Sequence, residues 1–426
     1  MHDIKFIKNN PELFDAGLRK RNLEPISREI ISLYNDYLKV LSQKEEFQKK
    51  RNNLTKEISI LSKQQSLDKV EVLKKEVLKI KESINLFEKN ASENYNKLNL
   101  KLLSIPNNIH ENVPIGKSEE DNVVLSINGD DRVFNFKPKN HLELGESLKM
   151  LNYEQAQKIS GSRFSILSND LALIHRALVN YLLDTHTHEN NYSEIIVPEL
   201  VKSKTLEGTG QLPKFSDDLF HTSKDLWLIP TAEVCLTNLN RDSIINSDTL
   251  PLRYTAYTNC FRQEAGASGR DTKGLIREHQ FGKVELVSIT LPEKSDNELE
   301  RMCGCVEKIL KNLDFKYKKV SLCSGDIGFS SSLTFDFEVW MPGQNKFVEV
   351  SSCSNCGDFQ SRRMKMRIKD QKSNEIFFPH TLNGSGLAIG RIIVAILENY
   401  QNSDGSVNIP KVLQTYMGGK KKIGPN

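Results

Sequence analysis

The sequence predicts an α+β protein in which a domain built on an antiparallel sheet follows an antiparallel two-helix coiled-coil arm. Three observations support this fold class. The stretch from Arg28 to Leu103 repeats apolar residues at helical spacing and contains neither Pro nor Gly. Residues 104–120 are rich in Pro, Asn and Gly, which indicates a linker. From residue 121 onward, short strand-like runs follow one another without the strand–helix alternation of a parallel doubly wound sheet.

The arm is expected over residues 27–103. Positions spaced alternately by four and three are mostly apolar: Leu33, Tyr37, Val40, Lys44, Phe47, Arg51, Leu54, Ile58 and Leu61, and again Val70, Leu73, Val77, Ile80, Ile84, Phe87, Ala91, Asn94 and Leu98. This spacing is typical of a coiled coil. The pattern breaks at Ser62–Ser66, so we expect two limbs, each about 50 Å long, folded back on each other.

Charge is unevenly distributed along the chain. Residues 27–103 contain 16 Lys and Arg against 11 Asp and Glu, a local excess of +5, whereas the whole chain has a net charge of +4. A polyanion should therefore be attracted first to the arm. A plain spacer or dimerising coil is the alternative interpretation of this segment.

Composition excludes several classes of protein. Hydrophobic residues make up 38% and charged residues 27% of the 426 residues, proportions typical of a globular protein with two or three domains. No apolar run approaches the ~20 residues that span a bilayer, so no membrane partner is expected. The first residues show no signal peptide. Seven scattered cysteines favour a reducing compartment, and we expect a cytoplasmic protein.

The second half of the chain is expected to contain one long helix and several strands. The helix is predicted at residues 171–188, and a β-rich run follows and is interrupted by Pro198. Strand-like runs are LWLIPTAEV (226–234), YTAYTNCFRQE (254–264), REHQFGKVELVSI (277–289), LTFDFEVWMP (333–342) and KFVEVSSC (346–353).

A basic segment at residues 261–281 is the first candidate site. It places Arg262, Glu264, Arg270, Lys273 and Arg277 around a Gly-rich loop between two strand-like runs. Alternation along a strand would put Arg262 and Glu264 on one face of the sheet. Arginine suits bidentate phosphate contacts, and a neighbouring glutamate would keep it oriented. A surface hairpin with ion pairs is the alternative.

Two further segments contain chemistry-bearing residues. Gly384, Gly386 and Gly390 precede a strongly apolar helix. The spacing of these glycines does not fit a dinucleotide-binding fingerprint. The simpler interpretation is that the small residues allow the helix to pack closely against the sheet. Arg391 enters that apolar helix and should have an anionic partner. The cysteines at 353–356 and 303–305 do not have zinc-ligand spacing, so no zinc is expected.

Together these segments resemble the class II aminoacyl-tRNA synthetases. Arg262-Gln263-Glu264 followed by Phe281 and Glu285 is similar to motif 2, residues 384–391 to motif 3, and the helix and strand ending at Pro198 to motif 1. Within that class the chain resembles the bacterial seryl-tRNA synthetases. The specific matches are GTGQLPKF (208–215), IPTAEV (229–234), EVSSCSNCGDFQSRR (349–363) and PHTLNGSGLAIGR (379–391). Cys235 departs from the family, where Pro follows TAEV.

The resemblance implies a domain order and a reaction. A tRNA-binding domain would occupy residues 1–103, a linker 104–120, and a class II catalytic domain 121–426 with a short basic tail. The enzyme would use ATP and Mg²⁺ to convert L-serine to seryl-adenylate and pyrophosphate. It would then transfer serine to the 3′-terminal adenosine of tRNA(Ser), and of tRNA(Sec) as well. The resemblance also implies a homodimer.

The resemblance also implies roles for individual residues. Arg262, Glu264 and Arg391 would be catalytic. The residues expected to bind L-serine are Thr231, Ala232, Glu233, Glu285, Asn383 and Ser385. Those expected to bind ATP are Arg262, Gln263, Glu264, Phe281, Glu349, Val350, Ser351, Ser352 and Arg391. Glu349 and Ser352 would also hold Mg²⁺, which prefers hard oxygen donors.

Three alternatives remain open. A ligase that loads an amino acid onto a carrier protein would lack the arm. A nucleic-acid-binding protein with an inactive second domain would not need Arg262, Glu264, Glu349 and Arg391. A class II enzyme for another amino acid is disfavoured by the TAEV and NGSG segments.

Overall fold

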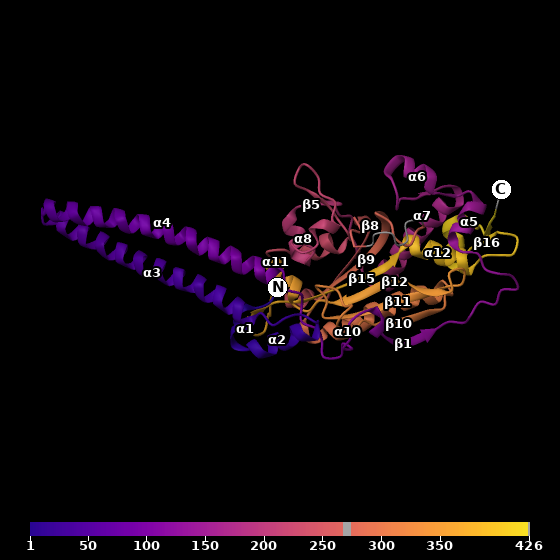
Figure 1. Ribbon diagram of the computed structural model, residues 1–426, viewed down its shortest axis with the longest axis horizontal. Coiled ribbons are helices and arrows are strands. Elements are labelled where there is room, and N and C mark those ends of the chain that lie inside the picture. Colours follow the sequence, from indigo (N-terminus) through magenta and orange to yellow (C-terminus); the bar gives the residue numbers. More distant parts are fainter. Residues whose placement is uncertain (267–273, 425–426) are drawn as a thin grey trace. The chain divides into compact units, whose positions relative to one another are not determined.

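The protein is described here by a computed structural model that covers residues 1–266 and 274–424 (Figure 1). It divides into two compact units. One contains residues 2–19 and 23–105, and the other contains residues 1, 20–22 and those from 106 onward. Among the described residues, no helix combines the length and the hydropathy that a membrane span requires.

The first unit is a long helical hairpin with two short helices at its base. α1 (Ile4–Asn9) and α2 (Pro11–Lys20) precede α3 (Ser27–Lys63) and α4 (Leu67–Leu103). Residues 64–66 join the long helices, so the predicted break and the two-helix arm are confirmed. Asp15 fixes the start of α3, because its carboxylate accepts a 2.6 Å hydrogen bond from the Ser27 hydroxyl and one from the Ser27 amide.

The two long helices pack along the predicted apolar seam. The rings of Phe47 and Phe87 lie 5.1 Å apart, and those of Tyr37 and Tyr95 lie 5.7 Å apart. On α4 the buried side chains are Val70, Ile80, Ile84, Ala91, Leu98, Leu102 and Leu103. Such facing aromatic and aliphatic side chains supply most of the free energy that holds two helices together.

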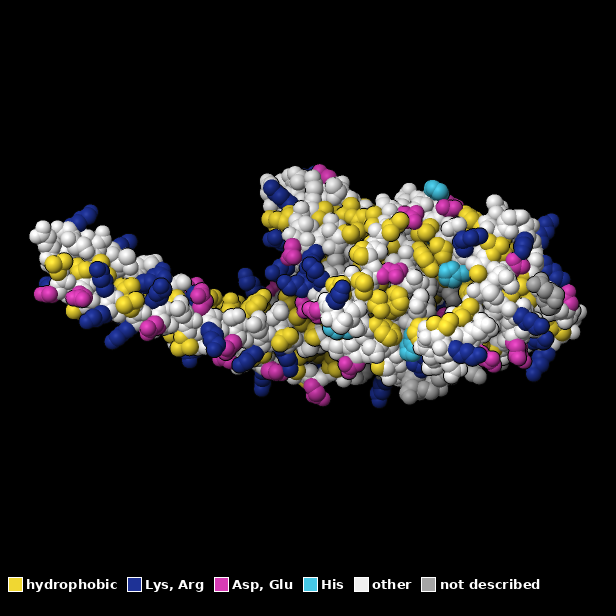
Figure 2. All heavy atoms as spheres, turned by 90° about the horizontal axis from the view of Figure 1, so that it is seen from above, with side chains coloured by type: hydrophobic (Ala, Val, Ile, Leu, Met, Phe, Trp, Pro, Cys, Tyr) yellow, Lys and Arg dark blue, Asp and Glu magenta, His cyan; other side chains and the backbone are white. Residues whose placement is uncertain are grey.

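The surface of the arm is strongly charged. Figure 2 shows Lys and Arg side chains interspersed with acidic ones along the hairpin. Three ion pairs join α3 to α4, namely Lys44–Glu88 at 2.6 Å, Lys50–Glu76 at 2.8 Å and Lys101–Glu29 at 2.7 Å. Because these pairs are partly exposed, each contributes no more than about 1 kcal/mol. The apolar seam therefore holds the hairpin together, and these ion pairs add little to its stability.

The second unit is built on an eight-stranded sheet. Its strand order is β1-β10-β11-β12-β15-β9-β8-β4, and every pair is antiparallel except β4 with β8. The bounds are β1 (Val123–Asn128), β4 (Ser193–Glu194), β8 (Leu252–Phe261), β9 (Gln280–Thr290), β10 (Tyr317–Ser321), β11 (Leu333–Met341), β12 (Lys346–Asn355) and β15 (His380–Ala388). The predicted α+β class with an antiparallel sheet is confirmed.

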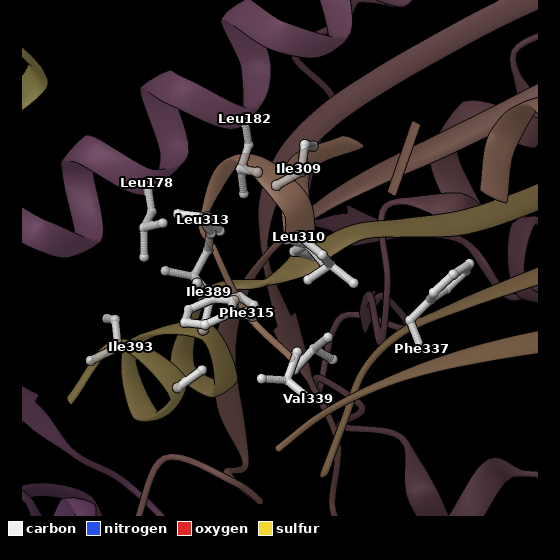
Figure 3. Close-up of a cluster of buried hydrophobic side chains, with 14 of the residues drawn as sticks. Leu178, Leu182, Ile309, Leu310, Leu313, Phe315, Phe337, Val339, Ile389 and Ile393 are labelled. Carbon is white, nitrogen blue, oxygen red and sulfur yellow. The ribbon is translucent and has the colours of Figure 1, made fainter. Parts of the chain in front are cut away.

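Helices cover one face of this sheet. α7 (Asn169–Asp184), α10 (Ser295–Asn312) and α12 (Ile389–Asn399) contribute side chains to the core shown in Figure 3, where they meet side chains of β11. Strand β11 shows why the sheet has two different faces. Phe335, Phe337 and Val339 are buried in this core, so the alternating residues Asp336 and Glu338 point to the opposite face. That opposite face carries the candidate site.

The remaining elements surround the sheet. Further helices are α5 (His141–Leu148), α6 (Tyr153–Ser160), α8 (Ser203–Thr209), α9 (Glu233–Asn238), α11 (Phe359–Met364) and α13 (Lys411–Gln414). Short strands outside the main sheet are β2 (Leu151–Asn152), β3 (Ile166–Leu167), β5 (Leu200–Val201), β6 (Trp227–Leu228), β7 (Ile244–Asn246), β13 (Arg367–Lys369), β14 (Ile376–Phe377), β16 (Val407–Asn408) and β17 (Lys422–Ile423).

One sequence-based expectation about the elements is wrong in detail. The run at 226–234 is not one strand, because only Trp227–Leu228 are extended and the run ends in helix α9. Gly384 and Gly386 lie inside strand β15, which runs directly into the apolar helix α12, so they precede a helix as expected. A Cβ atom at Gly384 would lie 2.7 Å from the sulfur of Met302, and one at Gly386 would lie 2.8 Å from Nε2 of His186. These glycines therefore let the strand pack closely against its neighbours.

Candidate active site

A polar cavity lies on the open face of the sheet, near the start of α12. Its volume is about 330 Å³, at the small end of the range for small-molecule sites. Of the residues predicted to bind ATP, those that line it are Arg262, Glu264, Phe281, Glu349, Val350 and Arg391. We call it the Arg262 cavity. Four elements meet at this cavity: the end of β8, the start of β9, the middle of β12 and the first turn of α12.

Three predicted ATP ligands do not line this cavity. The Gln263 side chain donates a 2.7 Å hydrogen bond to the carbonyl of Leu219. The Ser351 hydroxyl donates a 2.6 Å hydrogen bond to the Ser385 carbonyl and so joins β12 to β15. Ser352 faces a second cavity, described below.

The predicted pairing of Arg262 with Glu264 is wrong. Strand β8 ends at Phe261, and Glu264 has a φ of +52°, so the two residues are not alternating positions of one strand. Oε2 of Glu264 accepts a 2.6 Å hydrogen bond from Arg277 instead. Arg262 is held by the carbonyl of Pro230, 3.3 Å from its Nε, and its guanidinium lies 5.3 Å from the ring centre of Phe281.

The predicted basic residues of the segment between these strands have different outcomes. Arg277 lines the cavity, whereas Arg270 and Lys273 lie outside the described residues. On the other side of the cavity, the anionic partner expected for Arg391 is Glu349. Nη1 of Arg391 lies 3.3 Å from the Glu349 carboxylate and donates a 2.7 Å hydrogen bond to its backbone carbonyl.

A second group of predicted residues forms a cluster beside the cavity, which we call the Glu285 cluster. Glu285 lies on β9 and is only 2% exposed. Its Oε2 accepts a 2.6 Å hydrogen bond from the Thr231 hydroxyl and an ion pair from Lys283. Ser385 is the register partner of Glu285 on β15. Lys283 and Ser385 also line the Arg262 cavity, so the cavity and the cluster are contiguous.

Glu233 extends this cluster. Its Oε1 accepts hydrogen bonds from Gln360 at 2.7 Å and from Asn383 at 3.1 Å. Burial, and then the nearby Glu285 carboxylate, raise the pKa of Glu233 to about 7. Ala232, the remaining predicted serine ligand, is fully buried in a small apolar group with Leu236, Ala256 and Val287. Its side chain therefore packs α9 onto the sheet.

Sequence reasoning missed Lys283 and Gln360. Lys283 is buried apart from 7% of its surface and partners Glu285. The Gln360 amide is oriented by Thr381, whose hydroxyl donates a 2.7 Å hydrogen bond to Oε1 of Gln360. Lys283 lies two residues before Glu285, and Gln360 lies within the segment 349–363 that resembles the family. Neither residue belongs to a motif that would have indicated its role.

A larger cavity of about 770 Å³ adjoins the first along the same sheet face, and Glu349 lines both. Its acidic lining residues are Glu119, Glu120, Asp326, Asp336, Glu338 and Glu349. We call it the acidic cavity. Ser352 also lines it, so both predicted Mg²⁺ ligands face this space. Within residues 1–266 and 274–424, no group of three or more His, Cys, Asp or Glu side chains is arranged to hold a metal ion.

The seven cysteines are free and buried. Burial raises the pKa of Cys235 to about 12 and raises the pKa of Cys260 and Cys305 above its ordinary value. These thiols are therefore protonated at neutral pH and behave as small apolar side chains.

The fold and this face of the sheet are those of a class II aminoacyl-tRNA synthetase. Residues 214–400 match the family described as tRNA synthetase class II core domain (G, H, P, S and T). Residues 1–109 match the Seryl-tRNA synthetase N-terminal domain.

Full-length relatives specify the family further. The chain is 49% identical over 423 residues to a serine–tRNA ligase from Zymomonas mobilis, covering 99% of both chains. It is 48% identical to one from Methylorubrum populi, covering 100% of both. A seryl-tRNA synthetase from Pyrococcus horikoshii, solved with ATP, superposes with a TM-score of 0.90 at 35% identity and 100% coverage of both chains. The chain belongs to the seryl-tRNA synthetase family and is an aminoacyl-tRNA ligase.

Proposed function

We propose that the enzyme activates L-serine with ATP and then transfers serine to the 3′-terminal adenosine of tRNA(Ser). The observation that carries this proposal is the contiguity of the Arg262 cavity with the Glu285 cluster, which share Lys283 and Ser385. A nucleotide in the cavity would present its α-phosphate next to an amino acid in the cluster. The ATP bound to the P. horikoshii relative and the AMP bound to a serine–tRNA ligase of Naegleria fowleri, 28% identical with a TM-score of 0.86, support the nucleotide assignment.

In the first step the serine carboxylate attacks the α-phosphorus of ATP. One O–P bond forms, the bond to pyrophosphate breaks, and pyrophosphate leaves with its electron pair. Since the carboxylate is already ionised, no general base is required. Catalysis then depends on positioning and on charge neutralisation. Arg262 lines the cavity and is near enough to Glu233 to act on it electrostatically, so it would contact the α-phosphate and the serine carboxylate, while Phe281 would stack on the adenine.

The Glu285 cluster would recognise the other groups of serine. Glu233 is a buried carboxylate suited to the serine ammonium, and Asn383 and Gln360 hold it in place. Thr231 and Glu285 would meet the serine hydroxyl. Alanine and glycine fit any pocket that admits serine, but they would leave these buried polar groups unpaired, at a cost of about 1–3 kcal/mol per group.

Glu349 and Ser352 fit a Mg²⁺ ion because both offer hard oxygen donors to the same cavity. Bound there, Mg²⁺ would neutralise charge on the phosphate oxygens. The ion pair between Arg391 and Glu349 keeps a cationic guanidinium at the same edge of the Arg262 cavity, where it would contact the triphosphate or the adenine.

The arm would bind tRNA through its positive excess and its exposed charges. tRNA(Sec) would be served by the same surface. The family resemblance further supports a homodimer in which α7 and the segment up to Pro198 form the two-fold interface.

The decisive experiment is ATP–pyrophosphate exchange measured with each of the twenty amino acids. We expect exchange to depend on serine alone. Exchange that depends on another amino acid would reject the specificity, and an enzyme that charges no tRNA would reject the second step.

A further inference from the structure

One buried carboxylate oxygen in the acidic cavity lacks a partner. The Ser352 hydroxyl hydrogen-bonds to the Asp336 carboxylate, but Oδ1 of Asp336 is shielded from solvent and has no hydrogen-bond donor among the described residues. Three other carboxylates of the cavity have partners. Glu338 pairs with Lys318 at 2.9 Å, Glu349 pairs with Arg391 at 3.3 Å, and Asp326 accepts a 2.8 Å hydrogen bond from Asn122. Leaving a buried acceptor unpaired costs about 1–3 kcal/mol, more if it is charged.

The position of Asp336 brings it to the predicted Mg²⁺ ligands. In the pairing of β11 with β12, Asp336 lies directly opposite Ser352. Cβ atoms of such cross-strand partners are about 4.5–5.5 Å apart. The register shifts after Phe337, so that Glu349 pairs with Glu338 and still lines the same cavity. Two carboxylates and one hydroxyl therefore surround one space.

We propose that Asp336 is a third protein ligand of a divalent cation at Glu349 and Ser352, and that the cation binds before the nucleotide. The inference rests on the proposed function for the roles of Glu349 and Ser352. Two carboxylates and a hydroxyl supply three hard oxygens, and water molecules complete the six-fold coordination that Mg²⁺ and Mn²⁺ prefer. With only Glu349 and Ser352, the phosphates of ATP would have to recruit the cation.

The test is a titration of the nucleotide-free, full-length enzyme with Mn²⁺, with free Mn²⁺ measured by electron paramagnetic resonance. We expect one bound Mn²⁺ per chain. Asp336→Asn should weaken binding by at least about 10–100-fold, because the loss of a group that only orients a metal ligand already costs that much. Glu338→Gln is the matched control, because Glu338 lies on the same strand and in the same cavity but is paired with Lys318. It should change the Mn²⁺ affinity little.

A second readout keeps the proposal testable if the variant is less stable. Mn²⁺ without nucleotide should raise the melting temperature of the wild type and of Glu338→Gln, because a ligand that binds only the folded state stabilises it. Asp336→Asn should lose this shift, and Ser352→Ala should reduce it. Wild-type enzyme that binds Mn²⁺ only with ATP would overturn the inference. Equal losses of Mn²⁺ affinity in Asp336→Asn and Glu338→Gln would also overturn the inference. Such a result would indicate that Mn²⁺ is attracted to the acidic surface as a whole and not bound at one site.

The two proposals fail in different ways. If the enzyme shows serine-dependent pyrophosphate exchange but binds no Mn²⁺ without nucleotide, the cation site is rejected and the proposed function stands. Mn²⁺ binding at Asp336 without serine-dependent exchange would reject the proposed function alone.

Discussion

The Thr231 hydroxyl donates a 2.6 Å hydrogen bond to Oε2 of Glu285, although the two residues are 54 positions apart in the chain. The Lys283 ammonium contacts the same oxygen. Because Oε2 is engaged by two donors, Oε1 is the Glu285 oxygen that a substrate would meet. Thr231 thus fixes the direction in which the carboxylate faces its ligand.

Removing this contact should reduce serine activation. Glu285→Ala should lower kcat/KM for serine in pyrophosphate exchange by orders of magnitude and narrow the difference between serine and alanine. Thr231→Val keeps the shape but removes the hydrogen bond to a charged acceptor, which is worth about 1.5–3 kcal/mol, so a loss of roughly ten- to a hundred-fold is expected. Thr237→Val is the matched control, since the buried Thr237 hydroxyl has no partner among the described residues. Full activity of Glu285→Ala would mean that the pocket is misassigned.

Serine activation should also depend on pH through Glu233. Burial raises the pKa of this carboxyl to about 7, so it gains a proton as the pH falls through that value. The protonated form cannot pair with the serine ammonium. The value of kcat/KM for serine, which reports groups of the free enzyme, should therefore fall as the pH decreases from 8 to 6.

Glu278 provides the control for this profile. Burial also raises the pKa of Glu278 to about 7. Its carboxylate accepts a hydrogen bond from Ser165 and lines the Arg262 cavity, on the proposed ATP side, outside the Glu285 cluster that would hold the serine ammonium. Glu278→Gln should therefore keep the inflection in the serine profile. A profile that becomes flat in Glu278→Gln would assign the titration to Glu278 instead.

Shortening the arm should separate the two reaction steps. Phe47 and Phe87 face each other across the hairpin, so a short turn can replace residues 48–86. The shortened enzyme should retain serine-dependent pyrophosphate exchange, because the proposed active site lies in the other unit, but tRNA charging should weaken strongly. With the intact arm, tRNA affinity should fall as salt rises, because phosphate contacts release counterions. Equal loss of exchange and charging in a folded, shortened enzyme would contradict this division.

The assembly can be tested by light scattering. We expect a homodimer of about 97 kDa, twice the chain mass of 48.5 kDa, with the same surface used by both subunits. The mass should be independent of dilution across the micromolar range. An active monomer at these concentrations would be inconsistent with the proposed interface.

The sequence predicted the features that depend on local pattern. The hairpin followed from the spacing of its apolar residues, because that periodicity is local and uninterrupted. The segment at 226–234 was mistaken for a strand because short apolar runs do not distinguish a strand from the start of a buried helix such as α9. The Arg277–Glu264 pair was missed because the backbone leaves the strand at Arg262, and local alternation does not reveal where a strand ends.

The polar partners of the site required tertiary information. Gln360 reaches Glu233 across 127 positions of sequence, and Asp336 meets Ser352 only through the pairing of β11 with β12. One local signal did exist for Asp336. It alternates with Phe335 and Phe337, so an acidic side chain on the open face of the sheet could have been inferred from the sequence.

The burial of all seven cysteines makes the enzyme suitable for site-specific labelling. Thiol reagents attack the thiolate, and the native sulfurs are both shielded and, at Cys235, Cys260 and Cys305, protonated at neutral pH. A cysteine introduced by Gln64→Cys at the exposed turn of the arm would therefore react far faster than the native thiols. A fluorophore attached there would follow the encounter of the arm with tRNA directly, without removal of any native cysteine.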